Sequence, residues 1–165
     1  MMSPAFRRFA FLFLVLIGCS APTLHAQRER LPPEDLEIVE KRWPEAQKTS
    51  TGLRYIVLKE GDRSGGTPAA GMRASVLYKG MLLNGKVFDE TTDPAKPFRP
   101  RIGRGDLIAG WDQALQRMHK GEKWLLIVPY ELGYGTRGNP PHIPRRATLV
   151  FEMELVDFGK NLPTE

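Results

Sequence analysis

Apolar and polar residues from Gly52 onward follow the short periods that are typical of β-strands. Strand-forming segments bounded by glycine and proline occur at five places: LRYIVLKEG, MRASVLYKGMLL, KVFDE, KWLLIVP and ATLVFEMELVDF. Asn84–Gly85 separates the second segment from the third, and this dipeptide is the strongest short-range signal for a hairpin turn. The last segment alternates strictly, so one face of that strand is apolar: Leu149, Phe151, Met153 and Leu155.

One segment, GRGDLIAGWDQALQRMHKG, has the period of an amphipathic helix. Asp106 suits the N-cap and Gly121 suits the C-terminal stop. The apolar face of this helix consists of Leu107, Ile108, Trp111, Leu115 and Met118. Because a sheet with one apolar face needs a cover, the sequence predicts an α+β fold, with an antiparallel sheet of about five to six strands around one short helix.

Residues 27–50 form a polar extension with a second, short helix signal. Pro33 suits a first helical turn, and Pro44 stops the helix. Leu36, Val39 and Trp43 form one apolar stripe, which either binds a partner or second copy, or docks on the chain's own domain, or stays half-ordered on a tether. A helix of about three turns is marginal in water without a packing surface, which favours docking.

The first 26 residues resemble an export signal. A basic start through Arg8 precedes an apolar run at residues 9–18, which is shorter than the roughly 20 residues needed to span a bilayer. LIGC at residues 16–19 resembles the bacterial lipobox, in which Cys19 is lipidated; cleavage after Ala26 is the alternative. We expect an exported protein that is periplasmic or an outer-membrane-associated lipoprotein. Cys19 is the only cysteine, which excludes an intramolecular disulfide.

Composition and motifs exclude several classes of function. The 165 residues carry a net charge of +5, too small and scattered a surplus to indicate nucleic-acid binding. The three histidines are isolated, with no spacing that suits a metal site. GTRGNPP lacks the Lys-Ser/Thr ending of a phosphate loop, and no serine lies in a nucleophile motif. No metal and no cofactor is therefore expected.

Several motifs together resemble the FK506-binding protein (FKBP) family of peptidyl-prolyl cis-trans isomerases. They are YKGMLLNGKVFDET, KPF, IAGWDQALQRMHKGEK, LIVPYELGYGTRGNPPHIP and ATLVFEMELV, in this order over about residues 50–158. TSTGLRYIVLKEG resembles the lead-in of the bacterial exported members. The resemblance implies an FKBP-like domain at 51–160 after the signal (1–26) and extension (27–50), with a tail at 161–165.

The same resemblance implies a substrate pocket between sheet and helix. It assigns a catalytic role to Phe88, Asp89, Trp111, Tyr134 and Phe151, and substrate binding to Tyr78, Phe98, Leu107, Ile108 and Ile143. Trp111 is expected under the proline ring, with phenylalanine walls and with the Tyr134 hydroxyl and Ile108 N–H as donors to substrate carbonyls. Burial of a charge among apolar groups is costly, so Asp89 is expected among the aromatic rings as the polar point of the pocket, where it holds neighbouring donors and the twisted carbonyl region. Asn139, Asp106 and His142 depart from the usual family residues, which affects specificity.

The implied function is acceleration of X–Pro bond rotation while exported proteins fold. The expected partners are prolyl-containing unfolded or partly folded proteins, and FK506-like macrolides as inhibitors. We expect a monomer, attached to a membrane by a lipid if Cys19 is modified, with no nucleic-acid partner. The alternative is a prolyl-peptide binding module or holdase chaperone that uses the same pocket without turnover.

Overall fold

The computed structural model describes residues 29–163. The expected signal segment and Cys19 therefore lie outside the described residues. The described part contains two α-helices, two short 3-10 helices and six strands, in the order α1 (Pro33–Arg42), β1 (Gln47–Lys48), β2 (Arg54–Lys59), η1 (Arg63–Gly65), β3 (Arg73–Leu82), β4 (Val87–Thr91), α2 (Ala109–Leu115), β5 (Lys123–Val128), η2 (Tyr130–Leu132) and β6 (Leu149–Gly159).

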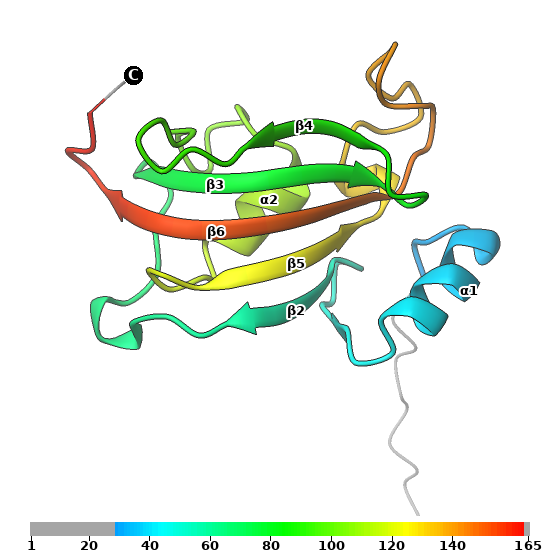
Figure 1. Cartoon of the computed structure of the whole chain (residues 1–165), viewed down its shortest axis with the longest axis horizontal. Coiled ribbons are helices and arrows are strands. Elements are labelled where there is room, and N and C mark those ends of the chain that lie inside the picture. Colours follow the sequence, from blue (N-terminus) through cyan, green and yellow to red (C-terminus); the bar gives the residue numbers. More distant parts are fainter. Residues whose placement is uncertain (1–28, 164–165) are drawn as a thin grey trace, which may run out of the picture.

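The six strands form one antiparallel sheet in the order β1-β2-β5-β6-β3-β4. The predicted α+β class is confirmed, and α2 lies behind the sheet in Figure 1. Asn84–Gly85 forms the expected turn between β3 and β4, with Gly85 at φ 90°. The two-residue strand β1, which pairs with β2, was not predicted. Its residues Gln47 and Lys48 are both polar, so the sequence has no alternation of apolar and polar residues there that would indicate a strand.

The main core fills the space between α2 and the sheet. Alternate residues of β5 and β6 point into it, as the pattern of β6 predicts. The buried members from these three elements are Trp111, Ala114, Leu115, Trp124, Leu126, Val128, Leu149, Phe151, Met153 and Leu155. Gly110 makes close packing of α2 possible, because a Cβ there would lie 2.7 Å from Cγ1 of Val128.

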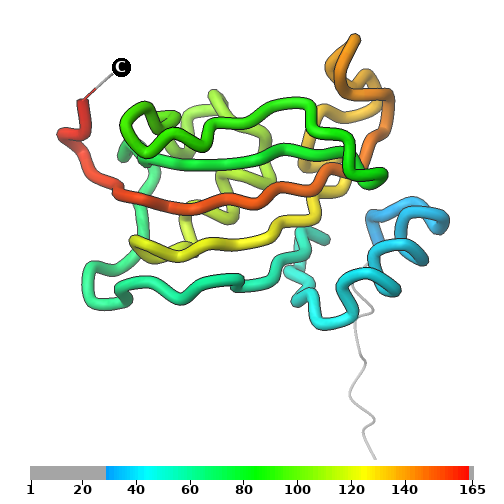
Figure 2. The backbone as a smooth tube through the Cα atoms, in the orientation of Figure 1, coloured from blue at the N-terminus to red at the C-terminus, as the bar shows by residue number. Residues whose placement is uncertain are grey.

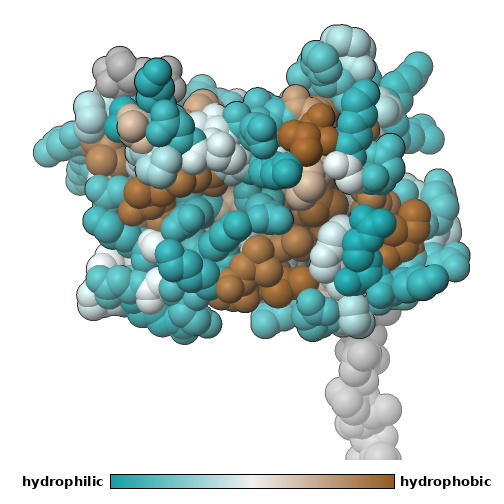
Figure 3. All heavy atoms as spheres, in the orientation of Figure 1, coloured by the Kyte–Doolittle hydropathy of each residue, from teal (hydrophilic) through white to brown (hydrophobic). Residues whose placement is uncertain are grey.

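A second core lies on the opposite face of the sheet, under α1. Val39 of α1 is fully buried against the intervening residues of β5 and β6, which are Leu125, Ile127 and Val150. Leu36 and Trp43 pack at its border, so the apolar stripe docks on the chain's own domain. Figures 1 and 2 show α1 beside one end of the sheet, and Figure 3 shows hydrophobic side chains gathered on the lower strands and next to α1.

Helix α2 is shorter than the sequence pattern predicts. Its N-cap is Ile108, in an extended conformation and without a side-chain cap, so the expectation that Asp106 caps the helix is wrong. The loop before α2 is held differently: Oδ1 of Asp112, inside the helix, accepts a hydrogen bond from the N–H of Gly103 at 2.8 Å. Leu107 and Ile108 therefore pack from a loop, although their spacing is helical.

Candidate active site

A pocket of about 450 Å³ lies between α2 and the β3, β4 and β6 side of the sheet. Six aromatic residues line it, together with short stretches of the loops around α2 and η2. The complete lining is Tyr78, Phe88, Asp89, Phe98, Gly105, Asp106, Leu107, Ile108, Ala109, Trp111, Gly133, Tyr134 and Phe151. Sequence reasoning placed nine of these residues in the site by motif, and the structure brings those nine together.

Trp111 is the centre of the aromatic cluster and is 5% exposed. The rings of Tyr78 and Phe151 meet it edge-on, with centroids 4.8 and 5.3 Å away. Phe98 is 6.2 Å away, and Phe88 contacts Phe151 at 5.7 Å, also edge-on. Edge-to-face contacts of this kind are preferred between aromatic rings and fix their orientation. Trp111 thus forms the floor of the pocket, and the rings around it form the walls.

Backbone features explain how these rings meet. Gly80 of β3 lies under two of them: a Cβ at this position would come within 2.8 Å of the Phe88 ring and 2.9 Å of Phe151. Phe98 returns to the sheet through a two-way backbone bridge with Val76, at 2.9 and 3.0 Å. The proline-containing loop at 92–97 thus ends with its aromatic ring against Tyr78 and Trp111.

Asp89 lies on β4 at the pocket edge and is exposed, so its carboxylate does not bear the cost of full burial. Its Oδ2 accepts a hydrogen bond from the hydroxyl of Tyr78 at 2.7 Å. Burial and this hydrogen bond raise the pKa of Tyr78 to about 12. The carboxylate therefore fixes the orientation of the Tyr78 ring and remains accessible to a ligand.

Two further polar groups of the pocket come from the loops on either side of the core. The Tyr134 side chain follows η2 and is 38% exposed; burial, and next the charge of Asp89, raise its pKa. The carbonyl of Ile108 accepts hydrogen bonds from the N–H groups of Trp111 and Asp112. No hydrogen bond from the Ile108 N–H to another residue of the described part is present. Both groups can donate to a bound carbonyl.

Comparison with known proteins identifies this arrangement. Residues 65–156 match the FKBP-type peptidyl-prolyl cis-trans isomerases. The chain belongs to this family. It is 40% identical over 107 residues to FK506-binding protein 1 of Dictyostelium discoideum, and the matched region covers 65% of this chain and 98% of that protein. It is 44% identical over 112 residues to the peptidyl-prolyl cis-trans isomerase FKBP2 of Homo sapiens, covering 66% and 79%.

A longer relative matches more of this chain and less of itself. The peptidyl-prolyl cis-trans isomerase FKBP4 of Mus musculus is 38% identical over 141 residues, which is 85% of this chain and 29% of that protein. The family match and these relatives make the chain an isomerase of the FKBP type, with the pocket on the α2 side of the sheet.

Ile143 is the one predicted binding residue that does not line the isomerase pocket. It is 3% exposed and belongs to the main core, and its backbone pairs with Asn139. Asn139 and His142 are exposed and also lie outside the lining. Four residues of the lining were not assigned to the pocket from the sequence: Gly105, Asp106, Ala109 and Gly133. These residues are sequence neighbours of predicted pocket residues, and this proximity could have indicated them.

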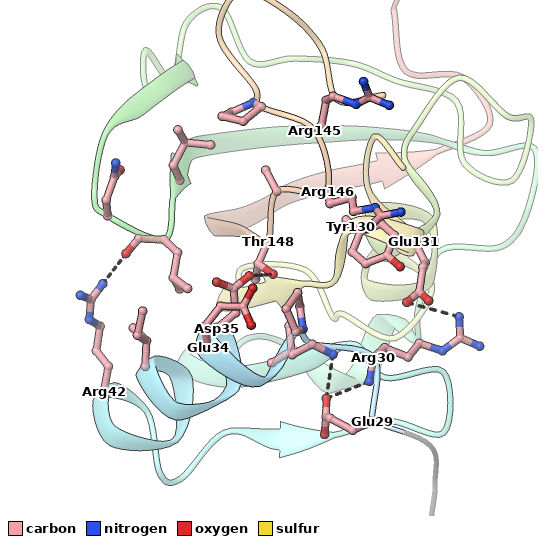
Figure 4. Close-up of a pocket in the computed structure, with 18 residues that line it drawn as sticks. Glu29, Arg30, Glu34, Asp35, Arg42, Tyr130, Glu131, Arg145, Arg146 and Thr148 are labelled. Carbon is pink, nitrogen blue, oxygen red and sulfur yellow. Dashed lines mark hydrogen bonds and ion pairs between the residues drawn. The ribbon is translucent and has the colours of Figure 1, made fainter. Parts of the chain in front are cut away.

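A second, larger groove of about 820 Å³ runs along the seam between α1 and the FKBP-type domain (Figure 4). Some of its polar groups bind one another across the seam. Asp35 accepts a hydrogen bond from Thr148 at 2.6 Å, and Arg42 donates to the carbonyl of Leu83 at 2.8 Å. Arg30 lies 3.9 Å from Glu131. These contacts attach the N-terminal extension to the sheet.

Glu29, at the start of the described residues, is the most strongly held charge of this seam. Its Oε2 lies 2.7 Å from Nζ of Lys48 and 2.9 Å from the guanidinium of Arg54. Burial alone would raise its pKa, but the hydrogen bonds from Lys48 and the N–H groups of Leu31 and Arg30, with the charge of Arg54, outweigh burial and lower the pKa to about 2.

Within the described residues, neither helix is long and hydrophobic enough to cross a membrane. The same part of the chain contains no group of three or more His, Cys, Asp and Glu side chains that could hold a metal ion.

Proposed function

We propose that this isomerase accelerates rotation about X–Pro bonds while exported proteins fold, and that the proline binds in the aromatic pocket. The observation that carries the proposal is the set of six aromatic side chains that line the pocket, with Trp111 at their centre and with accessible polar groups only at the pocket edge. Such a site suits a proline ring flanked by backbone carbonyls. Its chemistry needs no bond formation and no cofactor.

The chemistry follows from the electronic structure of the amide. Rotation crosses a barrier of about 18–20 kcal/mol because resonance is lost in the twisted state. The twisted amide has less charge separation than the planar one, so an apolar, water-poor pocket disfavours the planar form relative to the transition state. An acceleration of about 10⁴ requires roughly 5.5 kcal/mol, which desolvation and orientation can supply.

The pocket residues divide this work. Trp111 supports the proline ring, and Phe88, Phe98 and Phe151 exclude water from it. The Tyr134 hydroxyl and the Ile108 N–H donate to carbonyls on either side of the proline and hold the chain in a twisted conformation. Asp89 keeps Tyr78 in place through their hydrogen bond, which preserves the aromatic floor.

The cellular setting is proposed from the sequence. The basic start, the apolar run at residues 9–18 and LIGC support export followed by lipidation of Cys19, as in bacterial exported FKBPs. We further propose that the chain acts as a monomer, because the apolar stripe of α1 packs against its own sheet and is not free for a second copy.

A protease-coupled assay with prolyl peptides tests the function. We expect multiple turnover on Leu-Pro and Phe-Pro peptides, inhibition by FK506, and lower kcat/KM for Glu-Pro peptides, because desolvating a carboxylate in the pocket is costly. Binding of the same peptides without acceleration would favour the alternative, a binding module or holdase. Equal kcat/KM for Leu-Pro and Glu-Pro would contradict the proposed apolar contact with the residue before proline.

A further inference from the structure

The isomerase pocket has an unbalanced charge. Asp89 and Asp106 both line it, and the lining contains no Lys, Arg or His. Both carboxylates belong to exposed residues, so solvent and substrate can reach them. They approach the aromatic cavity from different parts of the chain, Asp89 from β4 and Asp106 from the loop before α2.

Neither carboxylate is neutralised within residues 29–163. Asp89 accepts a hydrogen bond from neutral Tyr78, and Asp106 makes no ion pair or hydrogen bond to a described residue. Arg104, the nearest basic residue along the chain, has its guanidinium beside Gly71, within 3.7 Å of where a Cβ would lie. The negative charge is therefore available to a ligand.

Carboxylates elsewhere on the sheet are arranged differently. Glu152 pairs with Lys123 at 2.6 Å, and Glu154 pairs with Lys59 at 3.1 Å. Near the end of β6, Asp157 pairs with Lys120 at 2.8 Å. These three carboxylates each have a cation beside them, whereas the two of the pocket do not.

The aromatic walls favour the same kind of ligand. The faces of Trp, Tyr and Phe rings attract cations, and this attraction strengthens where water is excluded. Lys and Arg also have apolar stems that pack along hydrophobic surface while the charged end reaches a polar group. Burial, and next the charge of Asp89, raise the pKa of Tyr134, so the Asp89 charge acts on another polar group of the pocket.

We infer that a Lys or Arg side chain directly beside the proline binds this isomerase better than an uncharged side chain of similar length, and that Asp89 and Asp106 receive the positive charge. The inference deepens the proposed function and rests on it. It makes Asp106, a residue of the pocket lining, a specificity-determining residue. The aromatic floor would still accept any proline, and the two carboxylates would determine how kcat/KM depends on the charge of the neighbouring residues.

The test uses peptides that differ only in charge. In one series the residue immediately before the proline is Lys or acetyl-Lys, and in the other series it is the residue immediately after the proline. The value of kcat/KM is measured with the isomerase at low salt and at about 0.5 M salt. We expect a preference for Lys of about fivefold in at least one series, the scale of one ion pair near water. Salt at this concentration should bring the ratio close to one.

Variants assign the preference to residues. In Asp106→Asn the Lys/acetyl-Lys ratio should fall at least twofold toward one, whereas Asp93→Asn, a matched change in the exposed loop outside the pocket lining, should keep it. A ratio of one in both series with normal turnover would overturn the inference and leave the isomerase function intact. An unchanged ratio in Asp106→Asn would overturn the assignment to that residue. No acceleration of any peptide would reject the proposed function itself.

Discussion

Tyr78 and Tyr134 are the two phenols of the aromatic pocket, and neither is placed to exchange protons near neutral pH. Burial and the Asp89 hydrogen bond raise the pKa of Tyr78 to about 12, and burial with the charge of Asp89 raises that of Tyr134. Both phenols therefore stay protonated far above neutrality. The pocket lining has no His, Cys or Lys that could take their place.

The pH dependence of catalysis should reflect rotation about the amide without transfer of a proton. We predict that kcat/KM is flat from about pH 6 to pH 8, because general acid–base catalysis leaves a profile set by its groups and amide rotation does not. The measurement is the peptide assay across that range, with folding monitored by circular dichroism. A bell-shaped profile centred near neutrality in folded protein would mean that the mechanism transfers a proton.

Three variants serve as controls for the same mechanism. Asp89→Asn keeps an acceptor for Tyr78 and should lose about tenfold, roughly 1.4 kcal/mol. Tyr134→Phe deletes one hydrogen bond, worth about 1 kcal/mol, and should retain substantial activity. Trp111→Ala removes the floor and should lose more than either, in part through damaged packing. Complete inactivity of folded Asp89→Asn would contradict rotation by desolvation and orientation.

The resemblance of the motifs to the FKBP family predicted most of the pocket, but it did not predict how exposed each residue is. A sequence that places Asp89 next to Phe88 suggests a buried charge, whereas alternation along β4 and the pocket opening leave the carboxylate in solvent. Ile143 shows the opposite case: its motif predicts a wall of the pocket, and packing puts it in the core. Both outcomes depend on tertiary contacts that local pattern does not contain.

At the scale of elements, periodicity located the five longer strands and both helices but misjudged the extent of α2. Leu107 and Ile108 continue the helical spacing, yet they pack from a loop that is tied to the helix through Asp112. The second core could have been predicted, because the segment KWLLIV has apolar residues on both faces of its strand. Leu125 and Ile127 need a cover of their own, and α1 provides it.

The attachment of this N-terminal extension should depend on pH through Glu29. Its pKa in the folded protein, about 2, lies below the ordinary value of 4.5, so its contribution to stability is present above about pH 4.5 and is lost as pH falls toward 2. Glu29→Gln should therefore lower the thermal unfolding temperature at pH 7, and the difference from the native sequence should shrink as the pH approaches 2.

The matched control is Glu37→Gln, an exposed residue of α1 with no ion pair in the described part of the chain. Its unfolding temperature should follow the native protein at every pH. Thermal unfolding is read by circular dichroism between pH 2 and pH 7. If Glu29→Gln differs from the native protein by the same amount throughout, the ion pairs with Lys48 and Arg54 are not the cause.

For the whole molecule, the sheet separates the N-terminal extension from the isomerase pocket. The aromatic pocket lies on the α2 side, and α1 with the seam of Glu29 lies on the other side of β5 and β6. A domain joined to a membrane through its N-terminal end can therefore present its pocket without moving α1. From Cys19 to Glu29 the chain has ten residue steps, which reach about 36 Å at most when fully extended.

Lipidation of Cys19 is the prediction that tests this arrangement in cells. A lipid anchor should place the native protein in the membrane fraction, label it with a fatty-acid analogue and make modified Cys19 the mature N-terminus. Cys19→Ala should remove the label and move active isomerase to the soluble periplasmic fraction, because the folded domain begins beyond this residue. Thr23→Ala, four residues further along the same segment, should keep the native label and location. A mature N-terminus at Gln27, without lipid, would instead establish cleavage after Ala26 and leave the isomerase periplasmic but unanchored.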